Sequence, residues 1–155
     1  MLAGKLYGAR VTATGSTFPR LPLLTTTNKP VSVPGTPTHD KYVLIDFWYS
    51  HCGPCISQFQ DPKNIYAFYR PKGFDILGIS VDKKNLVEDW KSAIQQYKLP
   101  WKQYLDLEGK EANKLSIEET PTNFLLDANG KIVVRDLDPA ALKLFLKSNL
   151  LWPMI

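Results

Sequence analysis

The chain has 155 residues, of which 44% are hydrophobic and 22% are charged, and its net charge is +4. This length favours one domain with a substantial buried core, and the composition is that of an ordinary globular protein. Scattered lysines without an arginine-rich stripe argue against nucleic-acid binding, and no apolar run approaches the roughly 18 to 20 residues of a membrane span.

The first 40 residues are rich in threonine, proline and glycine. Residues 1–17 are predicted to form an N-terminal arm, followed by a domain at 18–155. The arm lacks the apolar segment of about 7 to 15 residues that a signal peptide needs. The prolines exclude a long helix. Two short strands are predicted at 21–25 and 31–33, joined by a turn at 28–29; a partly ordered arm is the alternative.

Strands and helices are predicted to alternate after residue 40. Segment 42–49, YVLIDFWY, is almost uniformly apolar and predicts a strand that is buried on both faces. A helix follows at about 52–69, a second buried strand at 72–82 and a helix at 85–99. Asn85 and Glu88 resemble a capping box at the start of that last helix.

The remaining third of the chain predicts a short strand at 101–106, a short helix at 108–116 and a β-hairpin. The hairpin joins 122–127 to 131–137 through the Asn-Gly pair at 129–130. Asp138 and Pro139 then begin a final helix as its cap and first-turn proline. Strand–helix alternation indicates a mostly parallel α/β sheet covered by helices on both faces, with the hairpin as an antiparallel edge.

Both cysteines of the chain lie in SHCGPC, where a buried strand gives way to a helix. The start of a helix presents free N–H groups and the positive end of its dipole, which stabilise a thiolate. Cys52 is therefore the predicted exposed nucleophile. Cys55, one turn later, is the predicted, more buried resolving cysteine. Gly53 allows a tight turn, and Pro54 fits a first helical turn.

Two other roles for these cysteines are open alternatives. A structural zinc site needs about four ligands, and only His39 and His51 could join the cysteines; a soft metal such as copper could use His51, Cys52 and Cys55. A peroxidase would need proline and threonine around its reactive cysteine, whereas Cys52 follows Ser50 and His51. No metal site and no cofactor beyond the Cys52–Cys55 disulfide are predicted.

The segment LIDFWYSHCGPC closely resembles the active site of the thioredoxin superfamily, and ETPTNFLLD resembles its second signature. The resemblance implies a three-layer α/β/α sandwich with a mixed central sheet. It implies a cis-proline at Pro121 and binding of the substrate backbone beside Thr120. Gly53 and Pro54 are expected to contact substrate, and Trp48 matches a position near the family's active site.

Segment GISVDKKNLVEDWKSAIQQYKLPW is similar to the insertion of the TlpA/ResA-like branch, a group of secreted or envelope-anchored thiol–disulfide oxidoreductases. The resemblance implies an enzyme that reduces protein disulfides and is recharged by an upstream thiol donor. It implies a periplasmic or cell-envelope location and allows an anchor ahead of Met1. A monomer is expected. The Gly-Pro pair between the cysteines is that of thioredoxin, which suggests a reductant rather than an oxidant.

The chain departs from the branch at two positions. Gln58 stands where many members have a glutamate, and His51 stands where tryptophan is common. Asp46, six residues before Cys52, matches the buried aspartate of thioredoxin. We therefore expect Asp46 to act as the general acid/base for Cys55, with a pKa raised by its apolar strand. His51 is a candidate to stabilise the Cys52 thiolate.

Overall fold

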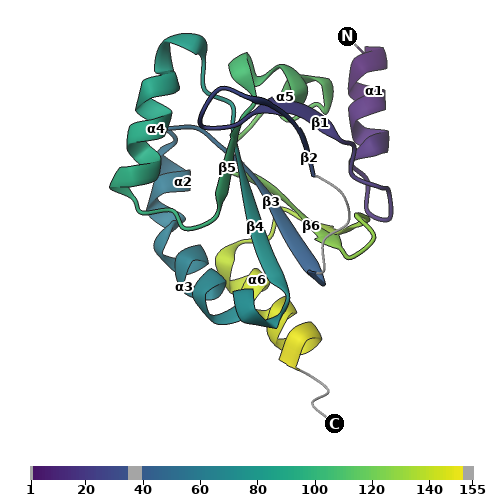
Figure 1. The fold of residues 1–155 in the computed structure, drawn as a ribbon. Helices are drawn as coiled ribbons and strands as arrows, with labels where there is room; N and C mark the ends of the chain where they lie inside the picture. The colour runs from purple at the N-terminus through teal and green to yellow at the C-terminus, as the bar shows by residue number, and fades with distance from the viewer. Residues whose placement is uncertain (1, 35–39, 152–155) are drawn as a thin grey trace.

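The computed structural model describes residues 2–34 and 40–151. A mixed seven-stranded sheet runs through the centre of this part of the chain, in the order β2-β1-β5-β4-β3-β6-β7 (Figure 1). The strands are β1 (Leu21–Leu24), β2 (Pro30–Val33), β3 (Tyr42–Trp48), β4 (Phe74–Ser80), β5 (Lys102–Leu105), β6 (Thr122–Asp127) and β7 (Ile132–Arg135).

The central strands are arranged as strand–helix alternation predicts. β3, β4 and β5 run parallel, while β6 and β7 add an antiparallel edge beside β3. The hairpin of β1 and β2 joins the opposite edge antiparallel to β5, through Leu24 and Leu105. The carboxyl ends of β3, β4 and β5 therefore share one edge of the sheet, from which the segment carrying the cysteines departs.

Helices cover both faces of the sheet. They are α1 (Leu2–Val11), α2 (Gly53–Gln58), α3 (Gln60–Tyr69), α4 (Val87–Gln96), α5 (Lys110–Lys114) and α6 (Pro139–Leu146), with short 3-10 turns at Arg70–Lys72, Lys84–Leu86 and Leu107–Gly109 and a π-helical turn at Lys147–Leu151. Side chains of α2, α3, α4 and α6 pack in one hydrophobic cluster, and those of α5 and the β1–β2 hairpin pack in another. The predicted three-layer arrangement is confirmed.

Alternation along β3 divides its side chains between the two clusters. Leu44 and Trp48 belong to the cluster beneath α2 and α3, whereas Ile45 and Phe47 belong to the opposite cluster. Successive strand residues point to opposite faces, so Asp46 faces the same side as Leu44 and Trp48. The strand therefore directs its one carboxylate toward the helix that carries the cysteines.

The N-terminal residues differ from the prediction. A ten-residue helix, α1, occupies Leu2–Val11, where an arm without a long helix was predicted. It packs against α5, and Gly8 makes this possible, because a Cβ there would lie 2.6 Å from the Leu115 carbonyl carbon. The prolines begin only at residue 19, so they could not prevent a helix before that point.

Two details of helix capping had opposite outcomes. Asp138 caps α6 as predicted: its Oδ1 accepts a hydrogen bond from the Ala141 N–H at 2.8 Å. The capping box at Asn85 is wrong, because Asn85 lies inside a 3-10 turn and α4 begins after Leu86 without a side-chain cap.

The predicted helix at 52–69 is divided into α2 and α3 at Phe59. Among the described residues, no helix is long and apolar enough to cross a membrane.

Candidate active site

The two cysteines lie at the junction between β3 and α2. β3 ends at Trp48, and Cys52 is the N-cap of α2, with an extended backbone. Its Sγ accepts a hydrogen bond from the Cys55 N–H at 3.2 Å. Pro54 occupies the first turn, where its missing N–H leaves no bond unmade. The local sequence therefore builds the strand–helix junction that the CGPC motif predicted.

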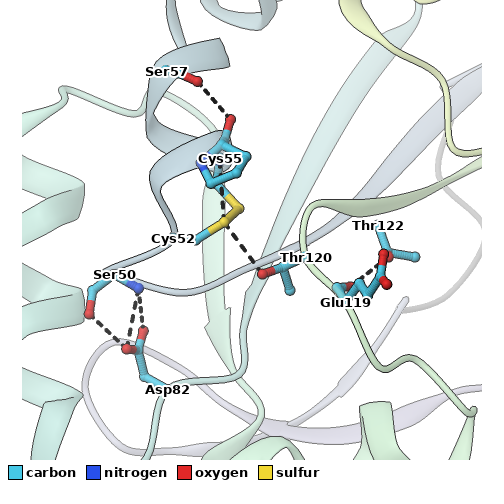
Figure 2. Close-up of a disulfide and its surroundings, with 9 residues drawn as sticks. Ser50, Cys52, Cys55, Ser57, Asp82, Glu119, Thr120 and Thr122 are labelled. Carbon is cyan, nitrogen blue, oxygen red and sulfur yellow. Dashed lines mark hydrogen bonds between the residues drawn. A yellow bond between two sulfur atoms is a disulfide. The ribbon is translucent and has the colours of Figure 1, made fainter.

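Cys52 and Cys55 form a disulfide, with an S–S distance of 2.09 Å and a Cα–Cα distance of 5.3 Å (Figure 2). The side chains face each other across one helical turn. Cys52 was predicted to be exposed and Cys55 more buried, but the two residues are 2% and 3% exposed. In this oxidised form both belong to the core cluster beneath the helices. Gly53 and Pro54, by contrast, are exposed between them.

The segment before β6 lies directly against the disulfide. The Thr120 hydroxyl donates a hydrogen bond to the Cys52 Sγ at 3.4 Å (Figure 2). The Thr120–Pro121 peptide bond is cis, as the resemblance implied. Both residues are half-buried. The fold therefore brings together the two sequence signatures, CGPC and TP, which are far apart in the chain.

A small hollow separates Asp46 from Cys55. Its volume is about 30 Å³, and Gln58, Phe59 and Pro121 contribute to its lining. That volume suffices for about one water molecule. Gln58 thus occupies the wall of the hollow with a neutral amide, and Asp46 is the carboxylate that lies against the same space as Cys55.

The surroundings of Asp46 keep its carboxyl from ionising readily. The register of the sheet places Gly78 and Asn123 beside it, and neither residue carries a charge. The Asn123 amide is already bonded to the backbone of Leu137, at 2.8 and 2.9 Å. Within residues 2–34 and 40–151, no hydrogen bond or ion pair reaches the Asp46 carboxyl. Burial therefore raises its pKa from 3.8 to about 7.

Trp48, which matches a position near the family's active site, lies in the core beneath the cysteines. The residue is fully buried, its indole N–H donates to the Gln103 Oε1 at 3.0 Å, and its ring packs edge-on against Phe59. Gln103 in turn lies against Gly78, where an added Cβ would clash with its amide. Trp48 is the last residue of a strand that is buried on both faces. Its side chain therefore packs in the core cluster that also contains both cysteines.

His51, the candidate to stabilise the Cys52 thiolate, is paired with a carboxylate of α4. Its imidazole Nε2 lies 2.7 Å from an Asp89 carboxylate oxygen, and both side chains are largely exposed. The ring therefore links the active-site segment to the first turn of α4. Nothing in the sequence indicated that His51 and Asp89 would pair, because only the fold places α4 beside residue 51.

A buried polar network next to the cysteines was not predicted from the sequence. Asp82, just after β4, accepts hydrogen bonds from Ser50, just after β3, and from Ser80. Figure 2 shows Asp82 beneath the chain that leads to Cys52. A signal was present: polar residues follow two buried strands, and the carboxyl ends of parallel strands share one edge.

The metal alternatives gain no support from the described residues, which contain no cluster of three or more histidine, cysteine or carboxylate side chains suited to a metal ion. His39, one of the two histidines considered as ligands, lies outside the described residues. His51 is bonded to Asp89 instead.

Comparisons with known proteins agree with this geometry. Residues 13–143 match the Redoxin family. The ResA thiol-disulfide oxidoreductases of Bacillus cereus and Oceanobacillus iheyensis are 30% and 32% identical over 93 and 92 residues, 60% and 59% of this chain. Those matches cover 53% and 47% of the relatives, so the chain spans about half the length of the curated relatives it matches.

Solved structures resemble a larger share of the chain. The thioredoxin domain of the thiol-disulfide oxidoreductase BVU-2223 from Bacteroides vulgatus is 31% identical, with a TM-score of 0.76 over 89% of this chain and 98% of that domain. A thiol:disulfide interchange protein from a Bacteroides species is 32% identical, with a TM-score of 0.78 over 92% and 93% of the two chains.

A mixed α/β sheet with a Cys-X-X-Cys disulfide at a strand–helix junction defines a protein of the thioredoxin-like class, as the solved neighbours show. The match over most of its length makes the assignment more specific: the chain belongs to the Redoxin family. Its relatives place it near the TlpA/ResA-like branch that the sequence indicated.

Proposed function

We propose that this protein is a thiol–disulfide oxidoreductase that reduces disulfide bonds of other proteins through a Cys52–Cys55 cycle. The observation that carries the proposal is the Cys52–Cys55 disulfide at the N-cap of α2, lying against Thr120 and above a carboxyl with a pKa of about 7. The names of the relatives support the same activity.

The reaction balances as two thiol–disulfide exchanges. The Cys52 thiolate attacks one sulfur of a substrate disulfide, forms a mixed disulfide and releases the other substrate sulfur as a thiolate. The Cys55 thiolate then attacks the Cys52 sulfur, forms the Cys52–Cys55 disulfide and releases the second substrate thiolate. The substrate gains two electrons, and an upstream thiol donor must return two electrons to the cysteine pair.

Asp46 has the properties of a proton acceptor for the second exchange. It shares the hollow with Cys55, and a single water molecule there could carry a proton between the thiol and the carboxylate. A pKa of about 7 lets the group both accept and return a proton near neutral pH. Gln58, in the wall of the same hollow, cannot titrate.

Substrate binding is proposed at the exposed rim of the disulfide. Gly53 and Pro54 are exposed, and Thr120 and Pro121 are half-buried on the other side of the sulfur atoms. A substrate chain lying between them would place its own disulfide beside Cys52. The resemblance to the TlpA/ResA-like branch supports a cell-envelope location and protein substrates, and a monomer stays the expected state.

The reduction potential of the cysteine pair tests the proposal. The protein would be equilibrated with dithiothreitol or glutathione buffers, and free thiols would be trapped by alkylation. We expect one two-electron transition below about −230 mV, near thioredoxin at about −270 mV. A value above about −180 mV would contradict the reducing direction, and a value near the −120 mV of DsbA would indicate an oxidant.

The same experiment separates the alternatives. If no intramolecular disulfide formed at any potential, the oxidoreductase proposal would be wrong. Titration of the reduced protein with Cu(I), followed by mass spectrometry, would then test the copper-binding alternative. Stopped-flow reduction of hydrogen peroxide would test the peroxidase alternative.

A further inference from the structure

Asp82 is a buried carboxylate that joins the end of β4 to the segment leading into Cys52. It is 1% exposed. It accepts hydrogen bonds from the Ser50 N–H at 3.0 and 3.2 Å, from the Ser50 hydroxyl at 2.7 Å and from the Ser80 hydroxyl at 2.5 Å. Every contact uses a carboxylate oxygen as the acceptor, which is the pattern of an ionised group.

This network fixes the chain just before the nucleophile. Ser50 stands two residues before Cys52, and Figure 2 shows the chain running from Ser50, bound to Asp82, to Cys52. The turn between them is closed by the Cys52 N–H, which donates to the Tyr49 carbonyl at 3.1 Å. Just after the neighbouring strand β4, the Val81 N–H donates to the Trp48 carbonyl at 2.9 Å. Both strand ends are therefore tied together, and residues 50–52 have little freedom to move.

The charge of Asp82 acts on the reduced form of the site. A negative charge near a thiol disfavours its thiolate, because like charges repel more strongly where water is excluded. The start of α2 favours the thiolate. Other ionisable groups near the site are the mutually paired His51 and Asp89, at the exposed rim, Asp46 beside Cys55, and Glu119, which adjoins Thr120. Among these carboxylates, Asp82 is the buried one that accepts hydrogen bonds from the backbone of the segment before Cys52.

We propose that Asp82 is a positioning residue of the redox site: it holds residues 50–52 in place, and its negative charge opposes the Cys52 thiolate and so keeps the cysteine pair reducing. A destabilised thiolate makes the reduced form less favourable, which is the reverse of the effect that makes DsbA an oxidant. The inference rests on the proposed disulfide cycle and names a group that tunes it.

The Asp82→Asn variant tests this role. The amide oxygen keeps the two Ser50 contacts made by Oδ1, and the amide N–H can donate to the Ser80 hydroxyl. The charge is lost together with one arm of the shared bond from the Ser50 N–H. Two quantities are measured in the full chain: the pKa of Cys52, from the pH dependence of its alkylation, and the equilibrium constant with dithiothreitol or glutathione. We expect the Cys52 pKa to fall by about one unit. We expect the equilibrium constant to shift by up to tenfold toward the dithiol, equivalent to at most about 30 mV.

Two further variants separate charge from structure. Asp106→Asn removes another buried carboxylate at the same edge of the sheet, where it binds the N–H groups of Glu111 and Ala112; it is expected to keep both quantities within twofold of the original protein. Ser80→Ala removes a donor from Asp82 and leaves its charge less screened. It is expected to shift the equilibrium about twofold in the opposite direction from Asp82→Asn.

The inference would be overturned if Asp82→Asn kept both quantities within twofold, or if Ser80→Ala shifted them in the same direction as Asp82→Asn. If Asp82→Asn did not fold, Ser80→Ala would decide alone, and an unchanged equilibrium would overturn the inference. Failure of the proposed function is recognised separately, because the unaltered protein would then form no reversible Cys52–Cys55 disulfide.

Discussion

At the scale of single residues, the chemistry of this site depends on how many polar partners surround each carboxylate. Asp46 lies between the uncharged Gly78 and Asn123, and its pKa rises to about 7. Asp82 accepts four hydrogen bonds and holds the chain before Cys52. Two carboxylates near one disulfide are therefore suited to different tasks, one to exchanging protons and the other to holding a charge.

Asp46 makes the stability of the protein depend on pH. Its folded-state pKa of about 7 lies above the ordinary 3.8, so between these values the folded protein keeps a proton that the unfolded chain has released. The stability contributed by the neutral group is full below about pH 4 and falls as the pH rises to about 7. Asp46→Asn removes this loss, and we expect the variant to gain up to about 4 kcal/mol on the original protein between pH 4 and pH 8.

Urea unfolding of the oxidised protein and the Asp46→Asn variant, measured from pH 4 to pH 8, checks this expectation. Asp61→Asn, on the exposed side of α3, is the matched control and should follow the original protein throughout. Parallel stability curves for the original protein and Asp46→Asn would show that Asp46 does not titrate in the folded state as described.

At the scale of elements, the helices begin and end where their sequences provide the groups to do so. α6 has Asp138 as N-cap and Pro139 in its first turn, and its buried residues Leu142 and Leu146 lie one turn apart. α5 begins after the αL residue Gly109, with its first free N–H groups bonded to Asp106. Such capping groups satisfy backbone donors that the helix itself cannot reach.

Loss of the cap on α6 should destabilise the protein by a measurable amount. Asp138→Ala removes the acceptor of the Ala141 N–H, and such a change costs about 1 kcal/mol. Asp138→Asn keeps an acceptor in the same place and should lie within a few tenths of a kcal/mol of the original protein. Denaturant unfolding measures both. Equal losses in the two variants would mean that the charge of Asp138, rather than its hydrogen bond, stabilises α6.

At the scale of the whole molecule, the two faces of the sheet have separate tasks. The cluster beneath α2, α3, α4 and α6 contains both cysteines, whereas the opposite cluster beneath α5 and the β1–β2 hairpin contains neither. α1 adds to the second face by packing on α5. The N-terminal helix is therefore remote from the disulfide in the sequence and belongs to the other layer.

Removal of residues 1–11 should leave the redox site intact. The shortened chain loses α1 but keeps Thr12, whose hydroxyl and carbonyl accept hydrogen bonds from Arg135. We expect cooperative unfolding with a stability lower by a few kcal/mol, and a reduction potential that differs by less than about 10 mV, because α1 packs against α5 and bonds to Ser116 and Glu118 rather than to the cysteines. Loss of cooperative unfolding, or a larger shift of the potential, would contradict a domain that begins after the N-terminal arm.

Particular residues show how far sequence reasoning reached. The strand at 42–49, the hairpin through Asn129–Gly130 and the cap at Asp138 follow local rules of periodicity, turn chemistry and capping, and the structure contains all three. The helix at Leu2–Val11 was missed because its own pattern is barely amphipathic and its packing depends on α5, more than 100 residues away. The Asn85 cap failed because a 3-10 turn competes locally with the helix start.

The sequence by itself determined the pair of cysteines, the order of strands and helices after residue 40, and the position of Asp46 in the buried strand before the cysteines, because these depend on residues near one another in the chain. The tertiary structure alone decided what surrounds them. It buries Trp48 and both cysteines, turns His51 toward Asp89 and binds Asp82 to Ser50. It also leaves the Asp46 carboxyl without an ion pair in the part of the chain that the structure describes. Burial, pKa and long-range hydrogen bonds depend on which elements pack together, and local sequence patterns do not contain that information.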